Sequence, residues 1–323
     1  MSVCTVHAKA YDPLGLVLPT HIIGNILFRK TLQYLNLMFP EMRGKKTKIP
    51  WDMEIEDFSP EHNFRSKWLK YFEMLKSLVE AAFPRSYKPG NVDPNIKPDL
   101  VTFSDGNEEA FGVVAYIVWS LADGNKESRL VMSKAKLGPL AHKGEVVKNE
   151  LSGATFAARL RLWITEHTNT EFGEFVHFLD SRIVQDMIIK ESYGFGTFAG
   201  LRVGEIQKKT NVSAWHHIAS EENVSDVLTK GVTPDKIMPG SLWQTGPAWL
   251  SEDRYRWPVT ERAPLSTEQL QTVRKFEKTI KPVRLSSYLT TTETSNTEKI
   301  CLDSIIMNSS SLKKAINSTA FLL

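Results

Sequence analysis

Short runs of apolar residues between positions 100 and 137 predict three consecutive strands. Residues 100–105, 111–121 and 129–137 are rich in β-branched and aromatic residues. Residues 122–125, Ala-Asp-Gly-Asn, are a typical turn between the second and third runs. The pattern indicates a meander whose first strand ends on a carboxylate.

The next segment alternates helical and strand patterns. Apolar residues recur at helical spacing over residues 146–167, 183–189 and 201–208, whereas compact apolar runs at 175–179 and 214–218 predict a fourth and a fifth strand. Three strands followed by alternating helices and strands indicate an α/β fold. We expect a mixed five-stranded sheet with flanking helices, preceded by a mainly helical segment.

That helical segment precedes residue 98. Apolar residues are dense from about 21 to 39, directly after Thr20, a residue type that favours a helix N-cap. A role in the buried core explains this first helix better than a membrane-spanning or partner-binding role. A second helix is predicted over about residues 60–82. The turn-rich residues 87–98 indicate a linker, so we place a domain boundary there.

The C-terminal part has two compositions. Three tryptophans lie among Pro and Gly residues: Trp243, Trp249 and Trp257. They could stack on bases or pack onto the preceding domain, and we favour packing. Residues 286–323 are rich in Ser, Thr and Asn and lack periodicity, so we expect a flexible tail.

Composition narrows the class of protein. With 323 residues, 41% hydrophobic and 24% charged, the chain is typical of a soluble globular protein, and a net charge of +3 permits nucleic-acid binding without requiring it. The cysteines, Cys4 and Cys301, have no metal-ligand spacing, which argues against a zinc site and favours a reducing compartment. No apolar run reaches the length of a membrane span, and secretion is not expected.

Four acidic residues occupy positions of chemical interest. Asp105 and Asp180 end predicted strands, Glu150 lies in the long helix near small residues that allow close packing on a sheet, and Asp226 follows the fifth strand. Ser225 is a candidate cap of a short helix that presents Asp226. Each acid alone has an ordinary explanation: an ion pair, a helix surface position, a turn former or a helix-start acid.

The joint pattern is more informative than any single acid. If the first and fourth strands are neighbours, Asp105 and Asp180 lie side by side, with Glu150 above and Asp226 opposite. Carboxylates this close repel one another, and metal ions are the usual compensation. Two metal ions about 4 Å apart can activate a water and stabilise the leaving oxygen in an in-line displacement at a phosphodiester. Such chemistry needs no side-chain nucleophile.

An ordered series of phrases resembles the polyprotein of BEL/Pao-type LTR retrotransposons. The phrases are YDPLGLVLP, FSDGNEEAFGVVAY, RLVMSKAKLGPL, NELSGATFAARL, FLDSRIV, WHHIASEENVSDVLTKG and SLWQTGPAWL. Over about residues 11–250 the resemblance is to the end of the reverse transcriptase, a connecting region and the ribonuclease H domain. Each phrase is weak alone, but the series is specific.

The resemblance implies a ribonuclease H-like fold that cuts the RNA strand of an RNA–DNA hybrid with two Mg²⁺ ions, or with Mn²⁺. The family's metal-binding acids correspond to Asp105, Glu150, Asp180 and Asp226. The domains it implies are a helical reverse-transcriptase thumb or connection remnant at 1–97, a ribonuclease H-like domain at 98–232, a Trp-rich extension at 233–285 and the tail at 286–323.

The chain departs from the family beside three of these acids. Asp-Gly-Asn at 105–107 replaces Asp-Ala-Ser, Leu-Asp-Ser at 179–181 replaces Thr-Asp-Ser, and Asn-Val-Ser-Asp at 223–226 replaces Asn-Pro-Ala-Asp. No metal ligand is lost, but residues that orient the ligands change. No Asp-Asp polymerase motif is found, so the chain should not polymerise DNA by itself and resembles a fragment of a retroelement.

Three functions are weighed at this point. The first is an active metal-dependent ribonuclease H, in which Asp226 is the more peripheral ligand. The second is an inactive remnant that serves as a nucleic-acid-binding or interaction module. A third, an unrelated metal-dependent phosphoesterase, requires the ordered phrases to be coincidence.

The expected partners follow from these functions. They are an RNA–DNA hybrid and the remaining parts of a retroelement polyprotein, with no membrane, and the expected compartment is the cytoplasm, with the nucleus as the alternative. Hybrid recognition would rest on A-form shape and 2′-hydroxyl contacts. Four lysines either contact phosphates or form a solvated face: Lys134, Lys136, Lys143 and Lys148.

Overall fold

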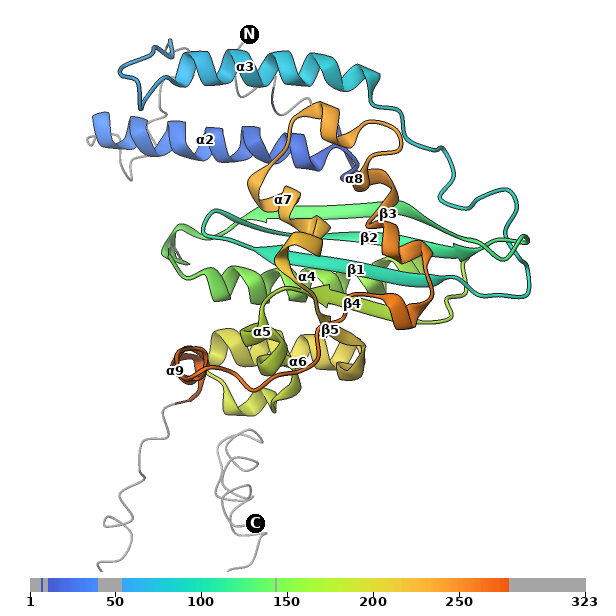
Figure 1. Cartoon of the computed structure of the whole chain (residues 1–323). Helices are drawn as coiled ribbons and strands as arrows, with labels where there is room; N and C mark the ends of the chain where they lie inside the picture. The colour runs from blue at the N-terminus through green and yellow to red at the C-terminus, as the bar shows by residue number, and fades with distance from the viewer. Residues whose placement is uncertain (1–6, 8–10, 40–53, 143, 279–323) are drawn as a thin grey trace, which may run out of the picture. The chain divides into compact units, whose positions relative to one another are not determined.

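A mixed five-stranded sheet with helices on both faces forms the core of the described residues (Figure 1). The computed structural model describes residue 7 and residues 11–39, 54–142 and 144–278. The predicted α/β class and the predicted helical segment before the sheet are both confirmed. The predicted tail at 286–323 lies outside the described residues.

The sheet combines an antiparallel meander with two parallel strands. β1 (Asp99–Gly106), β2 (Ala110–Ser120) and β3 (Lys126–Leu137) are antiparallel neighbours. β4 (Phe175–Leu179) pairs parallel to β1, and β5 (Trp215–His217) pairs parallel to β4, which gives the order β3-β2-β1-β4-β5. The first and fourth strands are therefore neighbours, as the candidate site requires.

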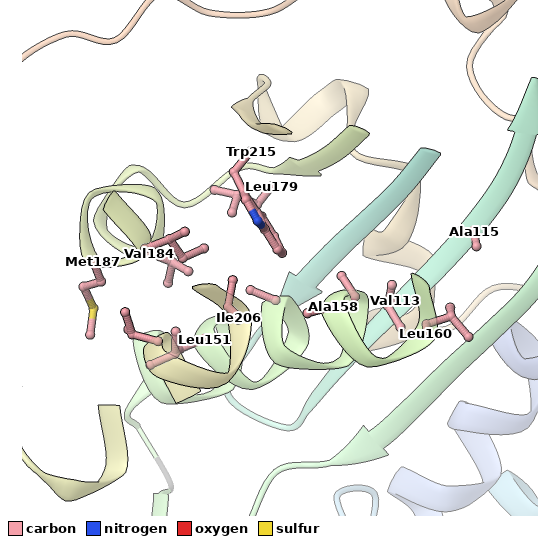
Figure 2. Packing of buried hydrophobic residues seen from close by; sticks show 14 of the residues in the cluster. Val113, Ala115, Leu151, Ala158, Leu160, Leu179, Val184, Met187, Ile206 and Trp215 are labelled. Atoms are coloured by element: carbon pink, nitrogen blue, oxygen red, sulfur yellow. The ribbon is translucent and has the colours of Figure 1, made fainter. Parts of the chain in front are cut away.

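One face of the sheet is covered by helices α4 (Val146–His167), α5 (Arg182–Ile189) and α6 (Thr197–Lys209). Figure 2 shows how side chains of α4, such as Leu151 and Ala158, gather with strand residues including Val113. β2 is buried along nearly its whole length, because helices and turns cover both faces of the sheet. The continuous apolar run of its sequence reflects this burial.

Helix α6 begins four residues before the predicted start at Leu201. Gly200 and Gly204 weaken the helical pattern in the sequence, since Gly has low helix propensity. In the structure Gly200 is needed at a close contact, because a Cβ there would lie 2.9 Å from the Ser192 carbonyl oxygen. Tertiary packing thus extends the helix through a glycine that the pattern treats as an interruption.

The opposite face is covered by α7 (Val227–Lys230), α8 (Leu242–Thr245) and the Trp-rich extension. Trp243 and Trp257 are buried and Trp249 is partly buried against strand residues such as Phe103 and Phe178. This packing confirms the favoured interpretation of the three tryptophans. They belong to the core of the sheet and are not free to stack on bases.

Two helices precede the sheet, α2 (Leu18–Met38) and α3 (Phe64–Ser77), the second followed by a 3₁₀ turn at Leu78–Glu80. The prediction that Thr20 caps the first helix is wrong: the helix starts earlier, with Pro19 in its first turn, and the Thr20 hydroxyl donates to the Val232 carbonyl oxygen at 3.1 Å. The second helix is also shorter than predicted.

The N-terminal segment is tied to the sheet before α2 begins. Ser133 of β3 donates its backbone N–H to the Leu14 carbonyl oxygen at 2.8 Å, and the Trp243 indole N–H donates to the Leu16 carbonyl oxygen at 2.7 Å. Gly15 has φ +73° and its Cβ position is occupied by Ser133, so only glycine fits there. Residues up to Lys278 form one compact unit, while the domain boundaries proposed near 97, 232 and 285 stay predictions.

Among the described residues, no helix combines the length and the apolar character needed to cross a membrane.

Candidate active site

The carboxyl ends of β1 and β4 place two of the predicted acids next to each other. Ser104 of β1 pairs with Leu179 of β4 in the parallel register, and each is followed directly by one of the acids, Asp105 and Asp180. Because the strands run in the same direction, both acids emerge at one edge of the sheet. The adjacency predicted from the sequence is present.

Of the two acids at the strand ends, Asp105 and Asp180, Asp105 is the more deeply buried. It is 8% exposed, and the Thr229 hydroxyl of α7 donates to its Oδ2. Burial raises the pKa of Asp105 to about 6; the Thr229 hydrogen bond opposes the shift, and the charges of Asp180 and Asp226 add to it. The alternative of a structural ion pair is not seen for Asp105 in the described part of the chain.

Close packing of α4 on β1 brings Glu150 to the same edge. A Cβ on Gly106 would lie 2.3 Å from the Glu150 backbone nitrogen, and one on Gly153 would lie 2.6 Å from the Asp105 carbonyl oxygen. Glu150 accepts a 2.6 Å hydrogen bond from the Ser181 hydroxyl. Burial raises the pKa of Glu150 to about 7, opposed by that hydrogen bond and reinforced by Asp180 and Asp105.

Asp226 sits at the edge of this group and has a cationic partner. It forms a 2.8 Å ion pair with Lys230, one turn further on, and its side chain is 39% exposed. The prediction that Ser225 caps this turn is wrong. Asn223 is the cap: its Oδ1 accepts from the Ser225 N–H, and its Nδ2 donates to the Ser104 carbonyl oxygen at 3.1 Å.

Several residues that shape the site were not singled out from the sequence. Thr229 and Lys230 bind Asp105 and Asp226, and His217 Nε2 lies 3.0 Å from the Asp180 carbonyl oxygen. Asn107, one of the departures from the family, donates to the Thr229 carbonyl oxygen at 3.1 Å and so helps place Thr229. Two of these contacts had a sequence signal: the capping pattern of Asn223, two residues before a polar Ser, and the spacing of four residues between Asp226 and Lys230.

The four acids share a neighbourhood but do not converge on one point. Among the described residues, no three His, Cys, Asp or Glu side chains are arranged to hold a metal ion. The Thr229 hydroxyl binds Asp105, and the Ser181 hydroxyl binds Glu150. Lys230 forms an ion pair with Asp226. Each of these donors occupies an oxygen that a cation would otherwise bind.

The donor set nevertheless suits a hard divalent cation. The buried Asp105 and the half-buried Glu150 have raised pKa values and lack a cationic partner within ion-pair distance in the described residues. Magnesium takes oxygen ligands, and a divalent ion would stabilise both charged forms. Asp105, Glu150 and Asp180 are therefore the residues that fit such an ion best.

The lysines expected to contact phosphates have other neighbours. Lys134 donates to the Pro13 carbonyl oxygen at 3.1 Å, and Lys148 forms an ion pair with Glu145. Lys136 is exposed, and Lys143 lies outside the described residues. Among the three described lysines of that set, only Lys136 is left as an uncommitted candidate.

Replacing Glu150 with Gln is expected to stabilise the metal-free protein at high pH. The pKa of Glu150 is about 7 in the folded chain, against 4.5 in the unfolded chain. The stability that this difference contributes is complete below about pH 4.5 and is lost as the pH rises through 7. Gln removes the charge and keeps an acceptor for Ser181. The gain at pH 8 should reach at most about 3 kcal/mol.

Urea unfolding at pH 5 and pH 8 in chelator measures this gain, with the exposed Glu166→Gln as the matched control. Most of the gain should vanish at pH 5. Equal stability of the Gln variant and the wild type at pH 8 would contradict the raised pKa.

Parts of this chain are similar to known proteins. A family model described as "Pao retrotransposon-like RNaseH-like domain" matches residues 2–181, a span that contains Asp105, Glu150 and Asp180. A solved structure, the N-terminal RNase H domain of Rv2228c from Mycobacterium tuberculosis fused to maltose-binding protein, is similar over 42% of this chain and 92% of its own, with 14% identity and a TM-score of 0.29. No curated protein matches.

Proposed function

This chain belongs to the Pao retrotransposon-like RNaseH-like family, whose model covers more than half of its sequence, and on that premise we propose that it hydrolyses the RNA strand of RNA–DNA hybrids with divalent metal ions. The observation that carries the proposal is the adjacency of Asp105 and Asp180 at the ends of two parallel strands, with Glu150 packed beside them. Three buried or half-buried carboxylates at one sheet edge suit phosphodiester hydrolysis.

Each acid has a proposed part in holding the metals. Asp105, Glu150 and Asp180 would bind two Mg²⁺ ions, or Mn²⁺, and the exposed Asp226 would be a peripheral ligand. When bound, the ions would supply an activated water and charge stabilisation at the leaving oxygen. The hydroxyls of Thr229 and Ser181 hold Asp105 and Glu150 in place from the protein side.

The same arrangement also supports a second candidate function. Lys230 pairs with Asp226, and among the described residues no ready group of three metal ligands is found. A chain with these contacts fixed would be an inactive remnant that binds nucleic acid or another segment of a retroelement polyprotein. We place either function in the cytoplasm, with the nucleus as the alternative.

A substrate panel tests the proposal. The purified chain is incubated in Mg²⁺ with an RNA–DNA hybrid, single-stranded RNA, duplex RNA and duplex DNA of the same sequence. We expect cutting of the RNA strand of the hybrid alone, because recognition rests on duplex shape and 2′-hydroxyls. Equal cutting of single-stranded RNA or of DNA would instead indicate an unrelated phosphoesterase, and binding of the hybrid without cutting would indicate the inactive module.

A further inference from the structure

A cavity of about 600 Å³ lies at the far end of β4 from Asp180. Its wall includes the beginning of β4 from Glu174 to His177, the end of α6 and the residues that lead into β5. The four candidate metal ligands are not among its lining residues. The cavity is therefore separate from the site described above.

Two buried nitrogen atoms of this wall have no hydrogen-bond partner among the described residues, Arg161 Nε and His177 Nε2. His177 is fully buried, and its other ring nitrogen lies 2.7 Å from the Thr102 hydroxyl oxygen. In the tautomer in which the Thr102 hydroxyl donates to this nitrogen, the ring proton lies on Nε2. Both unpartnered atoms are then donors, and a buried donor without an acceptor is costly.

The histidine is neutral and the arginine is held in a fixed position. Burial, together with the smaller effects of Arg161 and His216, lowers the pKa of His177 to about 3. The Arg161 guanidinium lies 3.8 Å from the ring centroid of Phe175 and donates to the Lys209 carbonyl oxygen at 3.3 Å. A planar cation fixed in this way is pre-organised to bind an oxyanion.

Positive charge exceeds negative charge around the cavity. Arg254 is paired with Glu174, and Lys209 is paired with Glu205 at 2.8 Å. Arg161 and the exposed Lys208 line the cavity and have no carboxylate within ion-pair distance in the part of the chain that the structure describes. The wall thus offers two uncompensated cations next to an unpartnered histidine donor.

We propose that this cavity binds a phosphate group, with Arg161, His177 and Lys208 as its donors. A phosphate oxyanion accepts the hydrogen bonds that both buried nitrogens lack, and the volume is sufficient for a nucleotide. The phosphate comes either from a free nucleotide or from the backbone of a nucleic-acid strand. The inference does not depend on nuclease activity.

Calorimetric titration with inorganic pyrophosphate in chelator tests the site without metal at the acids. We expect saturable binding at one site, weakened about tenfold or more in Arg161→Gln and about threefold in Lys208→Gln. The exposed Lys70→Gln on α3 is the matched control and should bind like the wild type. Glu150→Gln should also bind normally, which separates this site from the candidate active site.

Nitrogen NMR of the His177 ring gives a readout at the site itself. Pyrophosphate should shift the Nε2 resonance in the wild type. Competition with adenosine monophosphate tests a free nucleotide as the source of the phosphate, and competition with a single-stranded oligonucleotide tests a nucleic-acid strand. If Arg161→Gln fails to fold, the affinity of Lys208→Gln and the Nε2 resonance decide whether the cavity binds pyrophosphate. Absent saturable binding, an unmoved Nε2 resonance, or equal affinity in Lys208→Gln and Lys70→Gln would overturn the proposal.

Discussion

Replacing Asp180 with Asn is expected to reduce cleavage of the hybrid by roughly 1000-fold, since losing a shared metal ligand removes several kcal/mol of transition-state stabilisation. Asp180 follows β4, beside Asp105, and contacts His217 through its backbone carbonyl. The substitution keeps that backbone contact and the side-chain volume. Folding should therefore be unaffected, as judged by circular dichroism and urea unfolding.

Asp123→Asn is the matched control for this experiment. Asp123 is exposed in the turn between β2 and β3, at the other end of β2 from Gly112, the pairing partner of Asp105. The side-chain oxygen of Asn can still accept the turn hydrogen bond from the Asn125 N–H. Its cleavage rate should equal that of the wild type. Cleavage by the Asp180→Asn variant at the wild-type rate would show that the nuclease site lies elsewhere or that a contaminant cuts the substrate.

Replacing Trp243 with Ala is expected to destabilise the chain by about 3–5 kcal/mol. Trp243 is 2% exposed, lies in the core cluster with Tyr116, and donates its indole N–H to the Leu16 carbonyl oxygen. The substitution leaves a cavity and removes a buried hydrogen bond that joins the Trp-rich extension to the N-terminal segment. Denaturant unfolding should show a lower midpoint with little change in slope.

The partly exposed Trp163 on α4 supplies the control, because its ring stacks on His167 at the surface. Trp163→Ala should cost less than about 1 kcal/mol. If Trp243→Ala cost as little as is expected of Trp163→Ala, the extension would add little to the stability of the fold. A large loss for Trp243 alone would show that residues beyond the sheet are part of the folded unit.

The sheet was predictable where local pattern and tertiary burial agree. β2 reads as one apolar run because both its faces are covered, and Asp105 is recognisable because a carboxylate at the end of a buried strand is unusual. The adjacency of Asp180 and Asp105 was predicted for a sheet in which the first and fourth strands are neighbours, and the structure has this order. α4 matched its predicted bounds, since its apolar residues keep helical spacing throughout.

The contacts of the acids were not predictable in the same way. Thr229 reaches Asp105 only because α7 folds back over the end of β1, and nothing in the local sequence fixes that path. The Asp226–Lys230 ion pair, in contrast, is local, because the two residues are four positions apart. Asn107 joins this arrangement through the Thr229 carbonyl. His177 reads as one polar residue in a strand, yet its burial beside Arg161 depends on α4 lying across the sheet.

The measurement that tests the central claim most directly is strand-resolved cleavage of a hybrid that carries a different label on each strand. The wild-type chain is assayed in Mg²⁺, in chelator, and in chelator followed by excess Mg²⁺. The account predicts cutting of the RNA strand alone, lost in chelator and restored by the metal. Absence of cutting by the folded protein in Mg²⁺ or Mn²⁺ would contradict it and would leave Asp105, Glu150 and Asp180 as acids of a binding module.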